Sequence, residues 1–512
     1  MSQYQIGQRI FEPVEKARGT IKYIGQVDDT KGSWIGVDWD DPKRGKHDGS
    51  HNGTKYFKTQ SPTSGSFVRE AKISPGVTFE AAVEDRYGSS AEADPELIEN
   101  IRRDINAPFL QLVGFDKVNE TQSNFSKLKT ISVRDKGVYK AGDDLQSYSV
   151  TILDIAENLF GSWNTISAMC KQFKRLRNLN VSKNQLSLED IHEEDMKLAF
   201  SDLQTLYMGR MKYDWSQCHK ILGFMENLQC LQVYENGIQE IPIAHHAQNL
   251  VELNLTGNPL KTWENVMSIS TLPKLQRLSI NKCELENIEL YPEQSGFKML
   301  KSLQICENKL NKWQSIFSLD FLPALQDLKY KDNPITDSES STTSRQIVIA
   351  SISNLKVANG TEIEKVERFG AEVDFLKKYG LAFLEGSKDE EKLAKFHKDH
   401  PRYQALVKRF GAPEESELRV KDTSLKANLL KLSIICPDLK DTPRVSKSLP
   451  PAMIVSKLQG LVTRLIKPAR GKSVNLSYIS TIKPDLEVPL DNEMRDLFFY
   501  NVESGDTICV RW

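Results

Sequence analysis

One arrangement of apolar and polar positions returns eight times along residues 150–335. The clearest copies read Leu-x-x-Leu-x-Leu-x-x-Asn-x-Leu, and successive copies start 22 to 27 residues apart. Each copy predicts a short strand with alternate apolar side chains pointing inward, then a buried Asn whose amide satisfies backbone groups at the turn. One unit cannot bury its own apolar face, so we expect the units to stack around a continuous core. The copies start at Val150, Leu176, Leu203, Leu228, Leu250, Leu275, Leu300 and Leu325.

This period is typical of a leucine-rich-repeat solenoid, which we place at residues 145–363 together with its C-terminal cap. The residues between the inward leucines face the concave side, and they are polar, turning basic toward the C-terminal end. We expect a protein-binding surface here, and an acidic partner would suit its basic end. The alternative is a face that is only solvated. The candidate contacts are Tyr207, Tyr234, Arg277, Lys329 and Lys331.

Residues 1–85 form a different module, rich in Gly and β-forming residues with frequent turns, which predicts a small β-barrel or sandwich. Five of its segments together resemble a CAP-Gly domain, namely 19–25, 34–38, 45–49, 56–57 and 65–68. The resemblance implies a site for acidic C-terminal tails that end in an aromatic residue, such as the Glu-Glu-Tyr end of α-tubulin. The signature loop of that family commonly reads Gly-Lys-Asn-Asp-Gly, and here it departs once, at His47.

The chemistry of this loop suits such a ligand. Its two glycines allow unusual dihedral angles and a close approach of the backbone, and Lys46 offers a charge to a carboxylate. Exposed loop amides can form an anion-binding nest, and aromatic side chains can wall a slot for the terminal ring. The alternative is that the aromatics, Phe57 and Phe67 above all, are only the core of the barrel. The candidate tail-binding residues are Trp34, Gly45, Lys46, His47, Asp48, Gly49, Tyr56 and Phe67.

Two connecting regions flank the solenoid. Residues 86–144 are polar and mixed, and we assign them to a linker and an N-terminal cap, with a helix at 94–106 and a strand at 108–115. Residues 364–424 have apolar side chains at helical spacing and lead to a hinge near 411–413.

The last module, residues 425–512, resembles a ubiquitin-like β-grasp domain because a strand, a helix and further strands follow one another. Its sequence does not end in Gly-Gly, so we expect docking rather than conjugation to other proteins. The expected strands are 430–435, 476–479, 496–500 and 507–511, and the expected helix is 454–466.

Composition narrows the function further. The 68 Lys and Arg against 69 Asp and Glu give a net charge of −1, so there is no overall basic field to hold nucleic acid. No signal-like N-terminus and no run of eighteen apolar residues is present, so we expect no membrane segment. Seven scattered cysteines without a Cys-x-x-Cys pair indicate reduced packing residues in the cytosol, and Cys283 stands at an Asn position of a repeat.

No catalytic motif is complete. The sequence Gly-Lys-Ser at 471–473 ends like a phosphate-binding loop, but position 466 is Ile where that motif needs Gly. His245 and His246 are adjacent and cannot share one helical face, and His397 with His400 has no third ligand nearby. We therefore expect no enzyme, no cofactor and no metal.

The order of the three modules is similar to that of the tubulin-folding cofactor E family, with local matches at 45–51, 400–406 and 411–414. The resemblance implies a cytoplasmic, cytoskeleton-associated chaperone that holds α-tubulin and acts with cofactors B, C and D in assembling or dissociating the αβ heterodimer. One alternative is a microtubule-associated adaptor that uses the same loop and recruits a partner through its repeats. Another is a ubiquitin-pathway receptor that contacts the proteasome through its last module.

Overall fold

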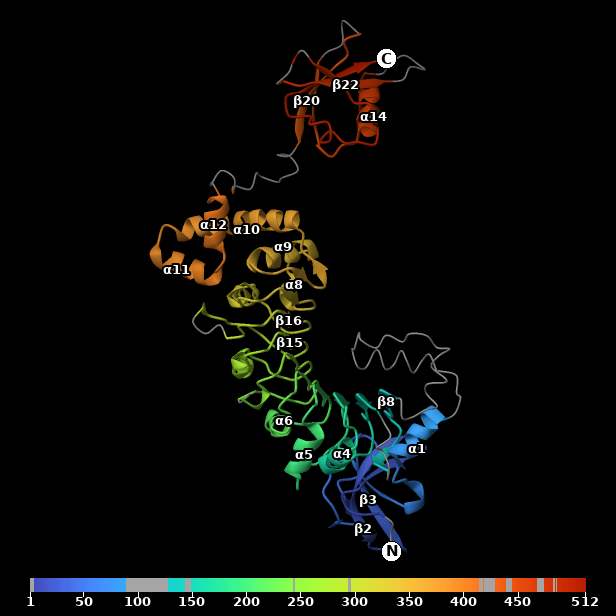
Figure 1. Cartoon of the computed structure of the whole chain (residues 1–512). Coiled ribbons are helices and arrows are strands. Elements are labelled where there is room, and N and C mark those ends of the chain that lie inside the picture. Colours follow the sequence, from blue (N-terminus) through green and yellow to red (C-terminus); the bar gives the residue numbers. More distant parts are fainter. Residues whose placement is uncertain are drawn as a thin grey trace. The chain divides into compact units, whose positions relative to one another are not determined.

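The computed structural model divides the chain into two compact units, Met1–Ala412 and Pro413–Trp512 (Figure 1). It describes residues 4–88, 128–142, 149–242, 245–292, 296–413, 418, 429–438, 444–466, 474–481, 484 and 486–512. The helix expected at 94–106 and the strand expected at 108–115 lie outside these residues.

The first unit begins with an antiparallel sheet in the order β1-β2-β3-β6. Its inward side chains, among them Ile10, Ile21, Val37 and Trp39, form a small separate core. A two-stranded hairpin follows β3 and leads back into β6, so the 45–49 loop lies between a central strand and this hairpin. The strands are β1 (Arg9–Glu12), β2 (Ala17–Gln26), β3 (Ser33–Trp39), β4 (Ser50–His51), β5 (Thr54–Lys55) and β6 (Gly65–Val68).

The N-terminal module continues directly into the solenoid. Strand β7 (Val77–Thr78) pairs in parallel with β9 (Val138–Lys140), and helix α1 (Phe79–Val83) starts at a Thr78 side-chain cap. Phe79 and Val83 are completely buried in the solenoid's core, where they cover its apolar end. A π-helical turn, η2 (Glu84–Gly88), follows α1.

The eight predicted repeats are confirmed as consecutive parallel strands of one sheet. Each central leucine pairs in register with the central leucine of the next strand and is at most 1 % exposed. The strands are β10 (Ile152–Asp154), β11 (Asn178–Asn180), β12 (Thr205–Tyr207), β13 (Cys230–Gln232), β14 (Glu252–Asn254), β15 (Arg277–Ser279), β16 (Ser302–Gln304) and β17 (Asp327–Lys329). One further strand, β8 (Thr130–Ser132), precedes β10 in the sheet and lies inside the segment assigned to linker and cap.

The buried asparagines tie each repeat to the one before it. Asn258 donates its amide protons to the carbonyl oxygens of Val233 and Leu255 and accepts from the backbone N–H of Asn236. Cys283 replaces the asparagine in the next repeat, and its thiol still donates to the Leu255 carbonyl at 3.3 Å. The side chain at this position therefore serves to donate a hydrogen bond to backbone carbonyl oxygens that are buried in the core.

Helices and helical turns run along one side of the solenoid, opposite its parallel strands (Figure 1). Each presents apolar side chains to the shared core; in α6, for example, Trp215, Cys218, Ile221 and Leu222 are buried. These elements are α4 (Trp163–Cys170), α5 (Glu193–Phe200), α6 (Trp215–Leu222), η5 (His245–Ala247), η6 (Glu264–Thr271), α7 (Gln314–Phe317) and η8 (Ser318–Phe321).

The C-terminal end of the solenoid is covered by helices. Glu372 of α10 is fully buried and pairs with Arg402, with Arg409 at 3.0 Å and with Arg368 at 3.9 Å. Tyr403 is also buried, and its hydroxyl donates to the Leu376 carbonyl at 2.9 Å. The elements are α8 (Pro334–Asp337), α9 (Ser341–Ser351), β18 (Val357–Ala358), β19 (Thr361–Glu362), α10 (Lys365–Gly386), α11 (Glu390–Asp399) and α12 (Tyr403–Phe410).

The second unit is a five-stranded sheet in the order β21-β20-β24-β22-β23 with one packed helix, which is the ubiquitin-like β-grasp. The prediction of a strand at 496–500 is wrong, since this run forms turns. Leu497 is buried but Phe498 and Phe499 both face solvent, so the side chains do not alternate as they would in a strand. The elements are β20 (Leu430–Ile435), β21 (Val445–Leu449), α14 (Val455–Ile466), β22 (Asn475–Ile479), β23 (Glu487–Pro489) and β24 (Thr507–Arg511).

Among the helices that the structure describes, none combines the length and apolar character needed to cross a bilayer.

Candidate functional site

The 45–49 loop is pinned to the edge of β6 by its backbone. The N–H groups of Lys46 and His47 both donate to the Gly65 carbonyl, at 2.7 and 3.2 Å, and the Gly65 N–H donates back to the His47 carbonyl at 2.8 Å. The loop therefore holds its side chains on a fixed frame.

The two loop glycines are required by chain packing. A Cβ on Gly45 would lie 2.3 Å from the Thr63 carbonyl oxygen, and one on Gly49 would lie 2.0 Å from the Phe57 carbonyl oxygen. Gly49 also has a φ of +94°, a conformation that L side chains rarely adopt. Contact between backbone segments thus accounts for both glycines, where the sequence had suggested close approach to a ligand.

Five aromatic rings gather beside the loop, and a sixth, His51, lies 6.3 Å from Phe67 at their edge. Phe67 is at their centre, 5.0 Å from His47, 5.4 Å from Phe57 and 5.5 Å from Tyr56, measured between ring centroids. Tyr23 completes the group at 5.2 Å from Tyr56, and its part was not predicted. Phe57 is 6 % exposed and belongs to the interior, whereas the other four rings are half-buried. The group therefore offers apolar surface next to a charged loop.

Trp34 lies under a guanidinium. The Arg69 side chain is 3.6 Å above the Trp34 ring and also donates to the carbonyls of Ser33 and Lys31. The indole N–H donates to the Thr30 hydroxyl at 2.8 Å. No ring contact between Trp34 and the aromatic group is recorded within the described part of the chain.

The charges of the loop have different surroundings. Asp48 accepts from the Lys55 ammonium at 3.1 Å and from the Ser50 N–H at 3.2 Å, and the bond from Lys55 is the main cause that lowers the pKa of Asp48. Lys46 is exposed, and its ammonium has no ion-pair partner among residues 4–88 or in the other described segments. The ammonium of Lys46, next in sequence to His47 of the aromatic group, is thus available to a carboxylate from outside.

His47 has a clear structural role. Its Nδ1 accepts the Gly49 N–H at 3.0 Å, so the ring proton is on Nε2. An Asn, the common residue of the family loop, offers its Oδ1 for the same kind of bond. Burial is the main cause that lowers the pKa of His47 below 6.5, and the neighbouring His51 adds to it.

Acid should weaken this loop. Because the pKa of His47 is lower in the folded state, its contribution to stability is present above pH 6.5 and is lost as the pH falls through the folded pKa. We expect the Gly49 amide to lose protection from hydrogen exchange, after correction for intrinsic rates, by about 1 kcal/mol on going from pH 7.5 to pH 5.

The matched control is His47→Asn, whose amide does not titrate. An equal loss of protection in His47→Asn would show that His47 is not the cause of the pH effect.

Two of the residues predicted for the concave face, Tyr207 and Tyr234, lie in successive repeats. Tyr207 lies in register between Asn180 and Gln232, and burial raises the pKa of its phenol well above its usual range. Tyr234 lies over Gly209, where a Cβ would come within 2.2 Å of the tyrosine ring. Together the two phenols give the middle of the face an aromatic surface.

Arg277 faces a partner that was not predicted. Its guanidinium is 2.7 Å from the carboxylate of Glu252, which also accepts from the Gln232 amide at 3.0 Å. Asn254 donates to the Gln232 side chain at 2.7 Å, so a hydrogen-bonded polar strip crosses β13, β14 and β15. Glu252 occupies the same first strand position as Arg277 in the neighbouring strand, and it was not among the predicted contacts.

Toward the C-terminal end, Lys329 is half-buried in register with Gln304, and Lys331 is exposed. Neither ammonium has an ion-pair partner among the described residues. The basic character expected here is therefore accessible to an acidic partner.

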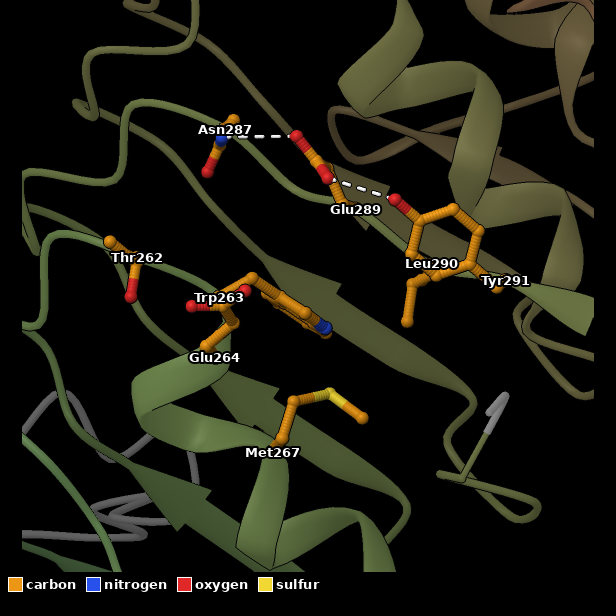
Figure 2. Close-up of a pocket in the computed structure, with 8 residues that line it drawn as sticks. All are labelled: Thr262, Trp263, Glu264, Met267, Asn287, Glu289, Leu290 and Tyr291. Carbon is orange, nitrogen blue, oxygen red and sulfur yellow. Dashed lines mark hydrogen bonds between the residues drawn. The ribbon is translucent and has the colours of Figure 1, made fainter. Parts of the chain in front are cut away.

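Figure 2 shows a shallow pocket of about 190 Å³ between two later repeats. Glu289 accepts from the Asn287 amide at 3.3 Å and from the Tyr291 hydroxyl at 3.0 Å, while the buried Trp263 forms its floor. No predicted site residue lines it. The lining residues are Thr262, Trp263, Glu264, Met267, Asn287, Glu289, Leu290 and Tyr291.

Residues 6–73 match the family model of the CAP-Gly domain. The molecule is therefore a CAP-Gly protein in which that domain precedes a leucine-rich-repeat solenoid and a ubiquitin-like module. The chain is 36 % identical to tubulin-specific chaperone E of Xenopus laevis, with 96 % of each chain covered. It is 34 % identical to tubulin-specific chaperone E of Homo sapiens, covering 99 % of this chain and 98 % of the relative. The chain belongs to the tubulin-specific chaperone E family.

Two solved structures are similar to single modules. One is the solution structure of the C-terminal ubiquitin-like domain of mouse tubulin-specific chaperone e, at 38 % identity, covering 18 % of this chain and 94 % of that chain with a TM-score of 0.16. The other is the Bik1 CAP-Gly domain with an ETF peptide from Bim1, at 45 % identity, covering 13 % of this chain and 78 % of that chain with a TM-score of 0.12.

Proposed function

We propose that this chain is a tubulin chaperone that captures α-tubulin and acts with cofactors B, C and D in assembling and dissociating the αβ heterodimer. The observation that carries the proposal is an exposed Lys46 with no ion-pair partner among the described residues, next in sequence to His47 of the half-buried aromatic group, in a chain that belongs to the tubulin-specific chaperone E family. The loop would grip the acidic tail of α-tubulin, with the carboxylates at Lys46 and the terminal ring against Tyr56 and Phe67.

The concave face would hold the folded body of tubulin. Its two phenols, its polar strip and the accessible Lys329 and Lys331 support a contact with an acidic protein surface. Two weak sites on one chain raise the effective concentration of each, so modest contacts give a useful combined affinity. The ubiquitin-like module would dock a second cofactor or the proteasome.

Capturing tubulin and assembling or dissociating its dimers requires no covalent chemistry. We propose a non-enzymatic, cytoplasmic and cytoskeleton-associated role, in which the chaperone acts through binding energy alone.

Dissociation of purified αβ-tubulin tests this function. The full chain with cofactor B is expected to convert heterodimers to smaller complexes that contain α-tubulin, measured by analytical ultracentrifugation. A variant in which Tyr207, Tyr234 and Lys331 are replaced by Ala should bind the tail peptide normally but dissociate dimers several-fold more slowly. Binding to microtubules without any splitting of dimers would instead favour the adaptor function that the CAP-Gly match also allows.

A further inference from the structure

Three histidines meet on the flank of the solenoid. His219 lies in α6, and His245 and His246 form the start of η5 in the next repeat. Their ring centroids are 4.6, 4.4 and 4.3 Å apart. One ring nitrogen of each lies within 4.8 Å of the others, which is close enough for a shared ligand after small side-chain rotations.

The repeat architecture brings them together. Helix α6 begins with a capping box between Asp214 and Gln217, and it buries Cys218 and Leu222 in the core, which leaves His219 at the edge. The next repeat places η5 against α6, and the buried Ala247 fixes that turn. His219 and His246 therefore come together because two successive repeats stack. Their positions in the sequence did not indicate this contact.

One ring nitrogen of His219 is unsatisfied. His219 Nε2 is buried and has no hydrogen-bond partner within the described segments. A buried polar atom without a partner costs free energy, and a bound ion would remove that cost. The nearest lysine in sequence, Lys220, directs its ammonium to the Leu188 carbonyl at 3.2 Å, which keeps its charge engaged elsewhere.

We propose that His219, His245 and His246 bind one divalent transition-metal ion, Zn²⁺ being the physiological candidate. Three imidazoles suit Zn²⁺, Co²⁺, Ni²⁺ or Cu²⁺, whereas Mg²⁺ and Ca²⁺ require oxygen ligands. Tetrahedral zinc with bonds of about 2.0–2.1 Å needs ligand nitrogens about 3.3 Å apart, and the exposed His245 and His246 supply that movement.

The surroundings of His219 favour the neutral imidazole, which is the form that binds a metal. Burial, with the two neighbouring histidines, lowers the pKa of His219 to about 4, so its lone pair is free of a proton at neutral pH. Three protein ligands leave the fourth position of a tetrahedral ion open to water or to a side chain of a bound protein. The ion would also join α6 to η5 and so clamp two adjacent repeats.

Cobalt provides a direct test on the full chain, prepared without a histidine tag. We expect one equivalent of Co²⁺ to give the intense visible absorption of a tetrahedral site, and Zn²⁺ to displace it. Competition with a chromophoric chelator then gives the Zn²⁺ affinity. The variant His245→Ala/His246→Ala changes two exposed side chains, so it should fold normally, and we expect it to lose the band and at least 100-fold in affinity.

The matched control is His192→Ala, which removes an exposed histidine of the preceding repeat. It should keep the wild-type affinity, and Zn²⁺ should raise the Tm of the wild type and of His192→Ala but not that of the double variant. The proposal is overturned if the wild type takes up no equivalent of Co²⁺, or if the double variant binds as tightly as His192→Ala.

Discussion

Replacing Lys46 by Ala is expected to weaken binding of a peptide ending in Glu-Glu-Tyr by about tenfold, which is about 1.4 kcal/mol. The Lys46 ammonium is exposed and has no partner among the described residues, so a carboxylate gains a charge-assisted bond without breaking another. Fluorescence anisotropy with a labelled peptide measures the change.

The loop backbone should survive this substitution, because it is held by bonds from the amides of residues 46 and 47 to Gly65 and by the two glycines. The matched control is Lys72→Ala, which removes an exposed lysine from the same module but outside the loop. Raising the salt concentration should reduce the difference in peptide affinity between Lys46→Ala and the wild type, because salt screens the charge of Lys46. Unchanged affinity in Lys46→Ala, or an equal loss in Lys72→Ala, would remove the tail-gripping proposal.

Replacing Glu372 by Ala is expected to lower the free energy of unfolding of the first unit by about 3–5 kcal/mol, because the Arg402 side chain, which is only 10 % exposed, loses its counter-charge. Glu372 is completely buried against Arg402 and Arg409, which makes the loss larger than for any surface pair. Urea unfolding followed by tryptophan fluorescence measures it.

Two variants sharpen this test. Glu372→Gln keeps two hydrogen-bond groups and the side-chain volume and should lose less than Glu372→Ala. Glu362→Ala removes an exposed carboxylate from β19 and should lie within about 0.5 kcal/mol of the wild type. A loss below about 1 kcal/mol in Glu372→Ala would contradict the prediction. It would mean that water solvates the arginines once the carboxylate is removed.

The repeats were predictable because their determinants are local. A leucine at each strand centre and an Asn at each turn follow from the needs of one unit, so the sequence pattern predicts the register of β10 to β17. Strand β8 was missed because its repeat is incomplete, with Lys136 where the pattern needs Asn.

The sites were less predictable because they depend on contacts across the fold. The 45–49 loop was found from its own residues, whereas the ring of Tyr23 reaches the aromatic group only through the pairing of β2 with β3. In the same way, His219 meets His246 only because two repeats stack, and no local spacing records that. Long-range packing supplied what the sequence pattern could not.

The burial of Phe79 and Val83 in the solenoid couples the stability of the N-terminal module to that of the first repeats. A fragment that begins after α1 would leave the first repeats without this cover, and a weakened first repeat would in turn loosen β7 and α1, which hold the N-terminal module against the solenoid. Substitutions that destabilise either part should therefore also destabilise its neighbour, through this packing contact alone.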